Sequence, residues 1–135
     1  MNIVVLLGLI PTQQFFKFLT VGALGFVVNV LVVYWLRDQF GLYWAGAVAF
    51  VLAGSTTWIG NRIWTFGDRR GTAAGSQWVR YLGYSLLGLA LYALVYGGLI
   101  ALSPFCRMFP VLPVCAGSLV GLFANFAVSR RLVFR

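Results

Sequence analysis

The sequence predicts an all-α integral membrane protein with four transmembrane helices, built as two repeated helical hairpins. Three observations predict this. First, 61% of the 135 residues are hydrophobic and only 9% are charged, whereas a soluble domain needs more polar residues to cover its surface. Second, four long apolar runs each approach the roughly 20 residues that a helix needs to cross a bilayer. Third, the ends of the second and fourth runs resemble each other.

The four apolar runs contain no charged residue and are each expected to form a transmembrane helix, because a helix pairs its own backbone groups inside lipid. The spans are expected at about residues 18–36, 42–60, 81–102 and 111–128. With their connections they form one transmembrane domain, residues 15–135. Residues 1–14 are expected to be a leader that is interfacial or disordered, because their apolar part is too short to cross and Pro11 follows it.

The basic residues are distributed unevenly between the two sides of the predicted bundle. Ten Lys and Arg against two acids give a net charge of +8, and only Arg37 and Arg107 fall on one side. The other eight are Lys17, Arg62, Arg69, Arg70, Arg80, Arg130, Arg131 and Arg135. Since positive charge collects in cytoplasmic segments, we expect both termini in the cytoplasm.

Several kinds of activity lack the residues that they need. The chain has no His and no Glu, and neither Asp lies in a span, so proton coupling and a small multidrug exporter are both disfavoured. There is no Gly-rich phosphate loop, and no nucleophile–base pair or metal cluster. We therefore expect a protein that is not an enzyme and needs no cofactor or metal.

Small and polar residues recur every four positions in the second and fourth runs, 68 positions apart. The second run has Ala45, Ala49, Ala53, Thr57 and Asn61, and the fourth has Pro113, Gly117, Gly121, Asn125 and Ser129. A step of four places each set on one stripe of a helix. Such stripes let helices approach closely in lipid, so Ala49, Ala53, Gly117 and Gly121 are predicted to pack helices.

The starts of the first and third runs also match. "FFKFL" (Phe15–Leu19) and "WVRYL" (Trp78–Leu82) each have an aromatic residue, a base, a second aromatic and a leucine. The chain therefore looks like two copies of a helical hairpin that start on the same side of the membrane, an arrangement that some transporters use.

The basic residues at the hairpin ends have two readings. In the first, they are topology anchors that extend to the interface within an aromatic belt. The belt residues are Trp58, Trp64, Phe66, Trp78 and Phe134. In the second, they line a cationic pocket for an anionic head group, which suits arginine because its fork binds two phosphate oxygens.

Three stretches resemble the GtrA family of small four-span membrane proteins. They are "FFKFLTVGALGFVVNVLVVYWL" from Phe15, "NRIWTF" from Asn61 and "ANFAVSRRLVF" from Ala124. The resemblance extends from Phe15 to Phe134. In the last stretch, Ser129 and Leu132 stand where an Asn and an aromatic residue would match more fully.

The resemblance implies a role in cell-surface polysaccharide or lipopolysaccharide modification at the inner membrane. Members of the family are thought to flip a polyprenyl-phosphate-linked sugar from the cytoplasmic to the outer leaflet, beside a membrane glycosyltransferase that makes the lipid. The alternative is an adaptor that recruits or positions the glycosyltransferase without transporting lipid, with its basic loop docked on that partner or on anionic phospholipid.

The head group of such a lipid meets a large barrier, because burying an isolated charge costs on the order of tens of kcal/mol. A seam of arginines, amides and hydroxyls would lower it. The residues expected to bind the phosphate are Lys17, Arg62, Arg80, Arg130 and Arg131. Those expected to serve the sugar or the seam are Asn29, Thr57, Asn61, Asn125 and Ser129. Four helices leave little room for an internal path, so we expect a homo-oligomer, and no nucleic-acid partner.

Overall fold

The computed structural model describes residues 11–69, 71, 73–109 and 111–134. Its elements in this part are all helical, as predicted. In chain order they are α2 (Thr12–Gly60), the π-helical turn η1 (Asn61–Thr65), α3 (Ala74–Leu102), α4 (Pro104–Met108), α5 (Val111–Val128) and the π-helical turn η2 (Ser129–Val133). Residues 1–10 of the expected leader, residues 1–14, lie outside the described part of the chain. Helix α2 begins at Thr12.

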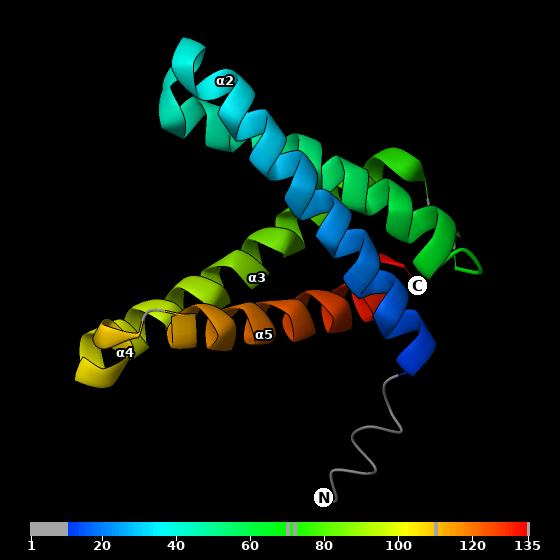
Figure 1. The fold of residues 1–135 in the computed structure, drawn as a ribbon. Helices are drawn as coiled ribbons and strands as arrows, with labels where there is room; N and C mark the ends of the chain where they lie inside the picture. The colour runs from blue at the N-terminus through cyan, green and yellow to red at the C-terminus, as the bar shows by residue number, and fades with distance from the viewer. Residues whose placement is uncertain (1–10, 70, 72, 110, 135) are drawn as a thin grey trace, which may run out of the picture.

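The long element α2 consists of two helical arms, residues 12–40 and 42–60, which fold back on each other at Gly41 (Figure 1). Gly41 has φ 79° and ψ 165°, a conformation that only glycine adopts without strain. The arms are antiparallel, because Gly60 lies against Val21 while Gly25 lies against Thr57. We call this pair of arms the first hairpin.

Helices α3 and α5 form the second hairpin, and the short helix α4 connects them at its tip (Figure 1). They are also antiparallel. Gly121 approaches the backbone carbonyl of Gly88, and Gly117 lies against Tyr92 one turn further along α3. Because glycine has no side chain, the two backbones come close, which is how helices associate in lipid.

The two hairpins meet at one end and diverge towards their tips (Figure 1). The end where they meet carries most of the core, in a group of rings that we call the aromatic cluster. It consists of Phe18, Phe66, Tyr81, Phe126 and Phe134. The rings of Phe66 and Phe134 are stacked with centroids 4.7 Å apart, and those of Phe18 and Phe126 meet edge to face at 5.3 Å. We call this end, which also carries Lys17 and Arg130, the basic end.

The two similar sequence ends fold in the same way. The second arm of α2 continues into η1, and α5 continues into η2. In each turn the N–H of the closing phenylalanine donates to the carbonyl five residues back, Phe66 to Asn61 and Phe134 to Ser129, both at 2.8 Å. This turn carries both rings inward, where they are fully buried. They lie in the core rather than in the expected aromatic belt.

Three described helices are long and apolar enough to cross a membrane, which agrees with a multi-pass membrane protein. They are Thr12–Leu42, Ala74–Leu102 and Val111–Val133, and they contain the first, third and fourth predicted spans. The second arm of α2, predicted as the remaining span, is helical but is not among them. Its last turns hold the polar run Ser55 to Thr57, which lowers its hydropathy.

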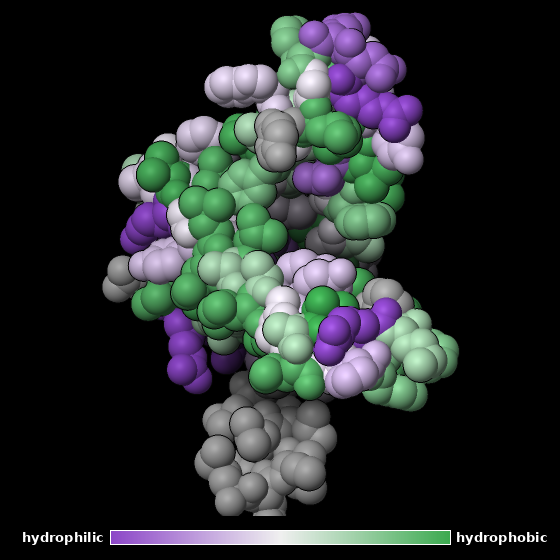
Figure 2. Space-filling view, turned by 90° about the vertical axis from the view of Figure 1, so that its left-hand side faces the viewer, coloured by the Kyte–Doolittle hydropathy of each residue, from purple (hydrophilic) through white to green (hydrophobic). Residues whose placement is uncertain are grey.

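The surface is typical of a protein surrounded by lipid. Figure 2 shows the side on which the hairpins diverge, and this side is mostly hydrophobic with hydrophilic residues in separate patches. Trp35 and Trp44 are each 71% exposed. Apolar surface of this extent on a monomer marks contact with a membrane or with another protein.

The small-residue stripes of the two hairpins are buried. Ala49 and Ala53 of α2 and Gly117 and Gly121 of α5 are all buried. Gly117 and Gly121 pack on α3 of their own hairpin, and Ala53 lies beside Gly25 of its own hairpin. The stripes therefore hold each hairpin together.

Candidate functional site

Two glutamines connect the start of each hairpin to its end. The Gln14 side-chain N–H donates to the Thr65 carbonyl at 3.3 Å, and that of Gln77 donates to the Val133 carbonyl at 3.5 Å. Thr65 and Val133 immediately precede the buried Phe66 and Phe134. The glutamines thus hold the two π-helical turns in equivalent ways.

Gln77 also joins the two hairpins. Its side-chain oxygen accepts hydrogen bonds from the indole N–H of Trp58 at 3.1 Å and from the guanidinium of Arg62. The Arg62 guanidinium lies 5.7 Å from the centre of the Trp58 ring. Arg62, predicted for phosphate binding, is therefore engaged in the contact between the hairpins.

A second polar network lies next to the aromatic cluster. The amide of Asn61 donates to the Tyr81 hydroxyl, which donates in turn to the Thr57 hydroxyl, both at 3.1 Å. Thr65 donates to the side-chain oxygen of Asn61 at 2.8 Å. Asn61 is only 1% exposed. Its polar groups are paired within the protein, so it serves the packing of the basic end.

The contact that corresponds to Arg62–Gln77 in the other half of the chain is not made. Arg130 stands 68 positions after Arg62, and Gln14 stands 63 positions before Gln77. The Nε of Arg130 and the Oε1 of Gln14 are both buried, and neither has a hydrogen-bond partner among the residues that the structure describes. A buried polar atom without a partner costs about 1–3 kcal/mol, so a shift of these side chains that gave the two atoms a partner would be favourable.

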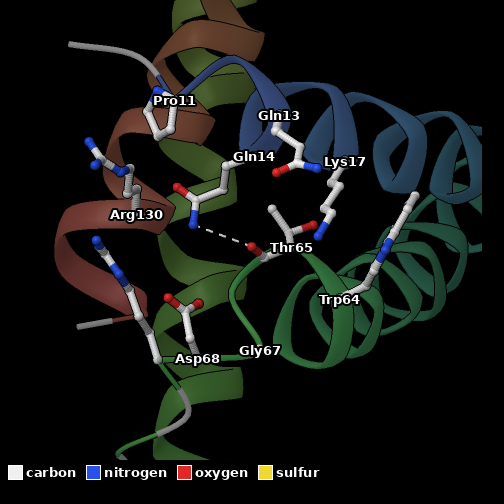
Figure 3. A pocket seen from close by; sticks show the side chains of 10 residues that line it. Pro11, Gln13, Gln14, Lys17, Trp64, Thr65, Gly67, Asp68 and Arg130 are labelled. Atoms are coloured by element: carbon white, nitrogen blue, oxygen red, sulfur yellow. Dashed lines mark hydrogen bonds between the residues drawn. The ribbon is translucent and has the colours of Figure 1, made fainter.

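These two atoms belong to residues that line a cavity of about 490 Å³ at the basic end, which we call the basic cavity (Figure 3). Its amide and charged lining residues are Gln13, Gln14, Lys17, Asp68, Arg69 and Arg130, and Trp64 and Thr65 also line it. Three bases face one acid, so the cavity attracts anions. Figure 3 shows Lys17 and Trp64 on one side and Arg130 on the other, with Gln14 between them. The Lys17 ammonium lies 5.7 Å from the centre of the Trp64 ring.

A second cavity of about 590 Å³ lies between the diverging hairpins, and we call it the interhairpin cavity. Twenty residues line it, and eighteen of them form nine pairs at matching positions of the two hairpins. In five pairs, a residue of the first arm of α2 matches a residue of α3 that stands 63 positions later. In the other four, a residue of the second arm of α2 matches a residue of α5 that stands 68 positions later. Examples are Phe18 with Tyr81 and Thr57 with Asn125. Residues at matching positions of the two hairpins therefore line the same cavity.

The aromatic cluster separates the two cavities. Phe18 lines the interhairpin cavity, and its ring centre is 6.4 Å from that of Phe66. Phe66 follows Thr65, which lines the basic cavity. Phe66 and Phe134 are fully buried between the hairpins, so their rings fill the space that lies directly between the two cavities.

The residues predicted for phosphate binding are separated by the fold. Lys17 and Arg130 come together in the basic cavity. Arg80 is half-buried and lines neither cavity, and Arg131 is exposed outside both. Arg69 lines the basic cavity although the sequence pattern did not single it out for phosphate.

The residues predicted for the sugar or the seam also divide into two groups. Asn29, Thr57 and Asn125 line the interhairpin cavity, while Asn61 and Ser129 are buried at the basic end. Of the predicted belt, Trp64 lines the basic cavity. Trp58 and Trp78 are half-buried, and the Trp78 indole N–H donates to the Ser55 hydroxyl at 2.8 Å.

Sequence reasoning missed Gln14 and Gln77, although a signal for them exists. Each stands directly before the matched motifs "FFKFL" and "WVRYL", so a comparison extended by one residue finds the pair. Tyr81, Ser85 and Tyr92 were also missed as cavity residues, because polar residues inside an apolar run give no pattern that distinguishes a cavity from helix packing.

The described residues hold no group of three or more His, Cys, Asp or Glu that is suited to a metal.

The family model of the GtrA/DPMS transmembrane domain matches residues 17–134. The chain belongs to the GtrA/DPMS transmembrane domain family. The resemblance to GtrA proteins expected from the sequence motifs is thereby confirmed. No curated protein is similar enough to count as a match. As a GtrA/DPMS member, the chain fits a membrane protein that handles lipid-linked sugars in glycosylation.

Proposed function

We propose that this GtrA/DPMS protein flips a polyprenyl-phosphate-linked sugar across the cytoplasmic membrane, with its basic end in the cytoplasm. The observation that carries the proposal is the basic cavity. It brings Lys17, Arg69 and Arg130 around one space, next to the unpartnered Nε of Arg130. A phosphodiester has the charge and the acceptor oxygens that these groups need.

The apolar tail of such a lipid can remain in the bilayer while its head occupies the basic cavity. Phe16 and Leu19, on the same helical arm as Lys17, are 64% and 41% exposed. They provide an apolar surface beside the cavity along which a polyprenyl chain can lie. Gln14 adds an acceptor, its unpartnered Oε1, that suits a sugar hydroxyl.

The path across the membrane would run between the two hairpins. We infer that each hairpin spans the membrane twice and that the hairpins are structural repeats, which the nine residue pairs around the interhairpin cavity support. To pass from the basic cavity to the interhairpin cavity, the head group needs the hairpins to part at the aromatic cluster. Each aromatic pair contributes only about 0.5–1.5 kcal/mol beyond its buried area, so a rearrangement that exchanges these contacts is feasible.

The described state is closed at the basic end and divergent at the tips. In the proposed cycle it is the state that releases the head group outward. The opposite state would separate Phe66 from Phe134 and Arg62 from Gln77, which are contacts between the hairpins. A gradient of loaded lipid, maintained by a partner glycosyltransferase, would set the direction.

The test uses purified protein in liposomes that carry a polyprenyl-phosphate hexose in both leaflets. A membrane-impermeant reagent reports how fast the inner-leaflet lipid becomes accessible. We expect fast access with the wild-type protein, and a rate at least about tenfold lower with Arg130→Ala, since a hydrogen bond to a charged group contributes about 1.5–3 kcal/mol.

Arg131→Ala is the matched variant, because it removes the same charge one residue away from an exposed position outside the cavity. It should keep the wild-type rate within about twofold. Access no faster than in empty liposomes, with folded protein, would reject the flippase and favour the adaptor. Equal loss in both arginine variants would reject the basic cavity as the phosphate site.

A further inference from the structure

The interhairpin cavity contains polar groups but no charged ones. None of its twenty lining residues is Asp, Glu, Lys, Arg or His. Its polar residues are Asn29, Thr57, Tyr81, Ser85, Tyr92, Ser118 and Asn125. Hydroxyls and amides both donate and accept hydrogen bonds. This chemistry differs from that of the basic cavity, where charge predominates.

The two walls of the cavity differ in polarity. Where the first hairpin has Phe18, Gly22 and Phe50, the second hairpin has polar residues at the paired positions. These are Tyr81, Ser85 and Ser118. One wall is therefore largely apolar and the other carries hydroxyls. A sugar ring matches this arrangement, because it has an apolar C–H face and hydroxyls at its edge.

The Asn125 side chain lies at the polar wall, where it packs against Gly88 of α3, which has no side chain. A Cβ placed on Gly88 would overlap the Asn125 amide, so the amide occupies the space that a side chain on α3 would take. No described residue hydrogen-bonds to the Asn125 side chain, and the same holds for Asn29 on the opposite hairpin. Two amides with free donors and acceptors thus border the cavity from both sides.

We propose that the interhairpin cavity holds the sugar of the lipid during transit, and that it accepts uncharged sugars while it excludes sugars with a carboxylate or an ammonium group. This inference rests on the proposed flipping activity. A charged substituent would lose its water and find no opposite charge on either wall. The cost of an unpaired charge at membrane depth is at least about 100-fold in an equilibrium.

The phosphate does not decide this selectivity. It is common to all lipids of the class, so the cost of its charge in passing the interhairpin cavity is the same for each of them, and the basic cavity binds it at the cytoplasmic side. The uncharged residues of the interhairpin cavity therefore determine which sugars are accepted.

The experiment compares three lipids with the same polyprenyl phosphate in the liposome assay. One carries an uncharged hexose, one a uronic acid and one an amino sugar. We expect the hexose lipid to move at least about tenfold faster than both charged lipids. Equal rates for all three would overturn the inference and leave the flippase intact. Rates no faster than in empty liposomes for all three would overturn both.

Asn125→Leu tests the cavity directly, because leucine has a similar size and no polar atom. It should slow the hexose lipid about tenfold, which corresponds to the loss of one or two hydrogen bonds. Its binding of polyprenyl phosphate without a sugar, which uses the basic cavity, should be unchanged. The control is Thr20→Val, which removes a hydroxyl from an exposed position outside both cavities. An unchanged hexose rate in folded Asn125→Leu protein would overturn the assignment.

Discussion

Gln14 and Gln77 occupy equivalent positions but have different surroundings. The side-chain oxygen of Gln77 accepts from Trp58 and Arg62, while that of Gln14 has no partner among the described residues. One residue type thus closes a contact in one half of the molecule and borders the basic cavity in the other. The difference between the halves is what produces an anion site.

Replacing Gln14 with Glu tests this interpretation. The new carboxylate would lie among Lys17, Arg69 and Arg130 and would pair with them in place of a phosphate. We expect Gln14→Glu to bind detergent-solubilised polyprenyl phosphate about tenfold more weakly, a difference of about 1.4 kcal/mol. Its thermal stability should change little, because the carboxylate loses the hydrogen bond to the Thr65 carbonyl but gains attraction to the neighbouring bases. Thermophoresis and a melting curve provide the two readouts.

Gln39→Glu is the control for Gln14→Glu, because it adds the same charge at an exposed position near the tip of α2. It should bind polyprenyl phosphate as the wild type does. An unchanged affinity in Gln14→Glu would remove Gln14 and its cavity from the phosphate site.

At the residue scale, two of the bases that the sequence pattern singled out line the basic cavity. Lys17 and Arg130 could be singled out because each flanks an apolar run beside aromatics, and the fold brings these two together. Arg62 and Arg80 follow the same pattern, but Arg62 bonds to Gln77 and Arg80 lies outside both cavities. A local pattern cannot separate them, since the difference depends on contacts between residues far apart in the chain.

At the element scale, glycines decide where helices approach and where polar side chains fit. Gly25 makes room for Thr57 in the first hairpin, and Gly88 makes room for Asn125 in the second. These two contacts are at paired positions of the hairpins. In each hairpin, a glycine of one helix thus leaves space for a polar side chain of the other helix, and that side chain borders the interhairpin cavity.

Gly88→Ala should therefore disturb both packing and transport. Its Cβ would overlap the Asn125 amide and force α3 and α5 apart, and overpacking of this kind costs about 1–3 kcal/mol. We expect a lower melting temperature and slower flipping of a polyprenyl-phosphate hexose. Thermal unfolding in detergent and the liposome assay measure these effects.

Gly83→Ala provides the comparison on the same helix. A Cβ on Gly83 would meet no atom within 4 Å, so this variant should retain the wild-type stability and rate. If both variants behave alike, the contact between Gly88 and Asn125 does not matter.

The sequence predicted the helices well and their ends less well. Apolar runs located the helices because length and hydropathy are local properties. The offset of 68 predicted that η1 and η2 resemble each other, but not that their turns bury Phe66 and Phe134. That outcome depends on the packing of one hairpin against the other, which a repeat within one chain does not reveal.

At the scale of the whole molecule, two helical hairpins meet at the aromatic cluster and diverge beyond it (Figure 1). A cationic cavity lies on one side of the cluster and an uncharged cavity on the other. We propose that the lipid head group crosses between the hairpins, so that they must separate at the basic end.

A reversible cross-link between the hairpins shows whether transport needs this separation. Phe15 of α2 and Phe123 of α5 stack with ring centres 5.3 Å apart, and neither lines a cavity. The protein would carry Phe15→Cys and Phe123→Cys, with the free Cys106 and Cys115 replaced by serine. A short cleavable thiol reagent then bridges the hairpins in liposomes.

We expect lipid flipping to fall to the rate of empty liposomes when the bridge is complete, and to recover when the bridge is cleaved. Neither single-cysteine variant can form the bridge within one molecule, so the reagent should leave those proteins active. Undiminished flipping by fully bridged protein would show instead that the head group crosses without separation of the hairpins.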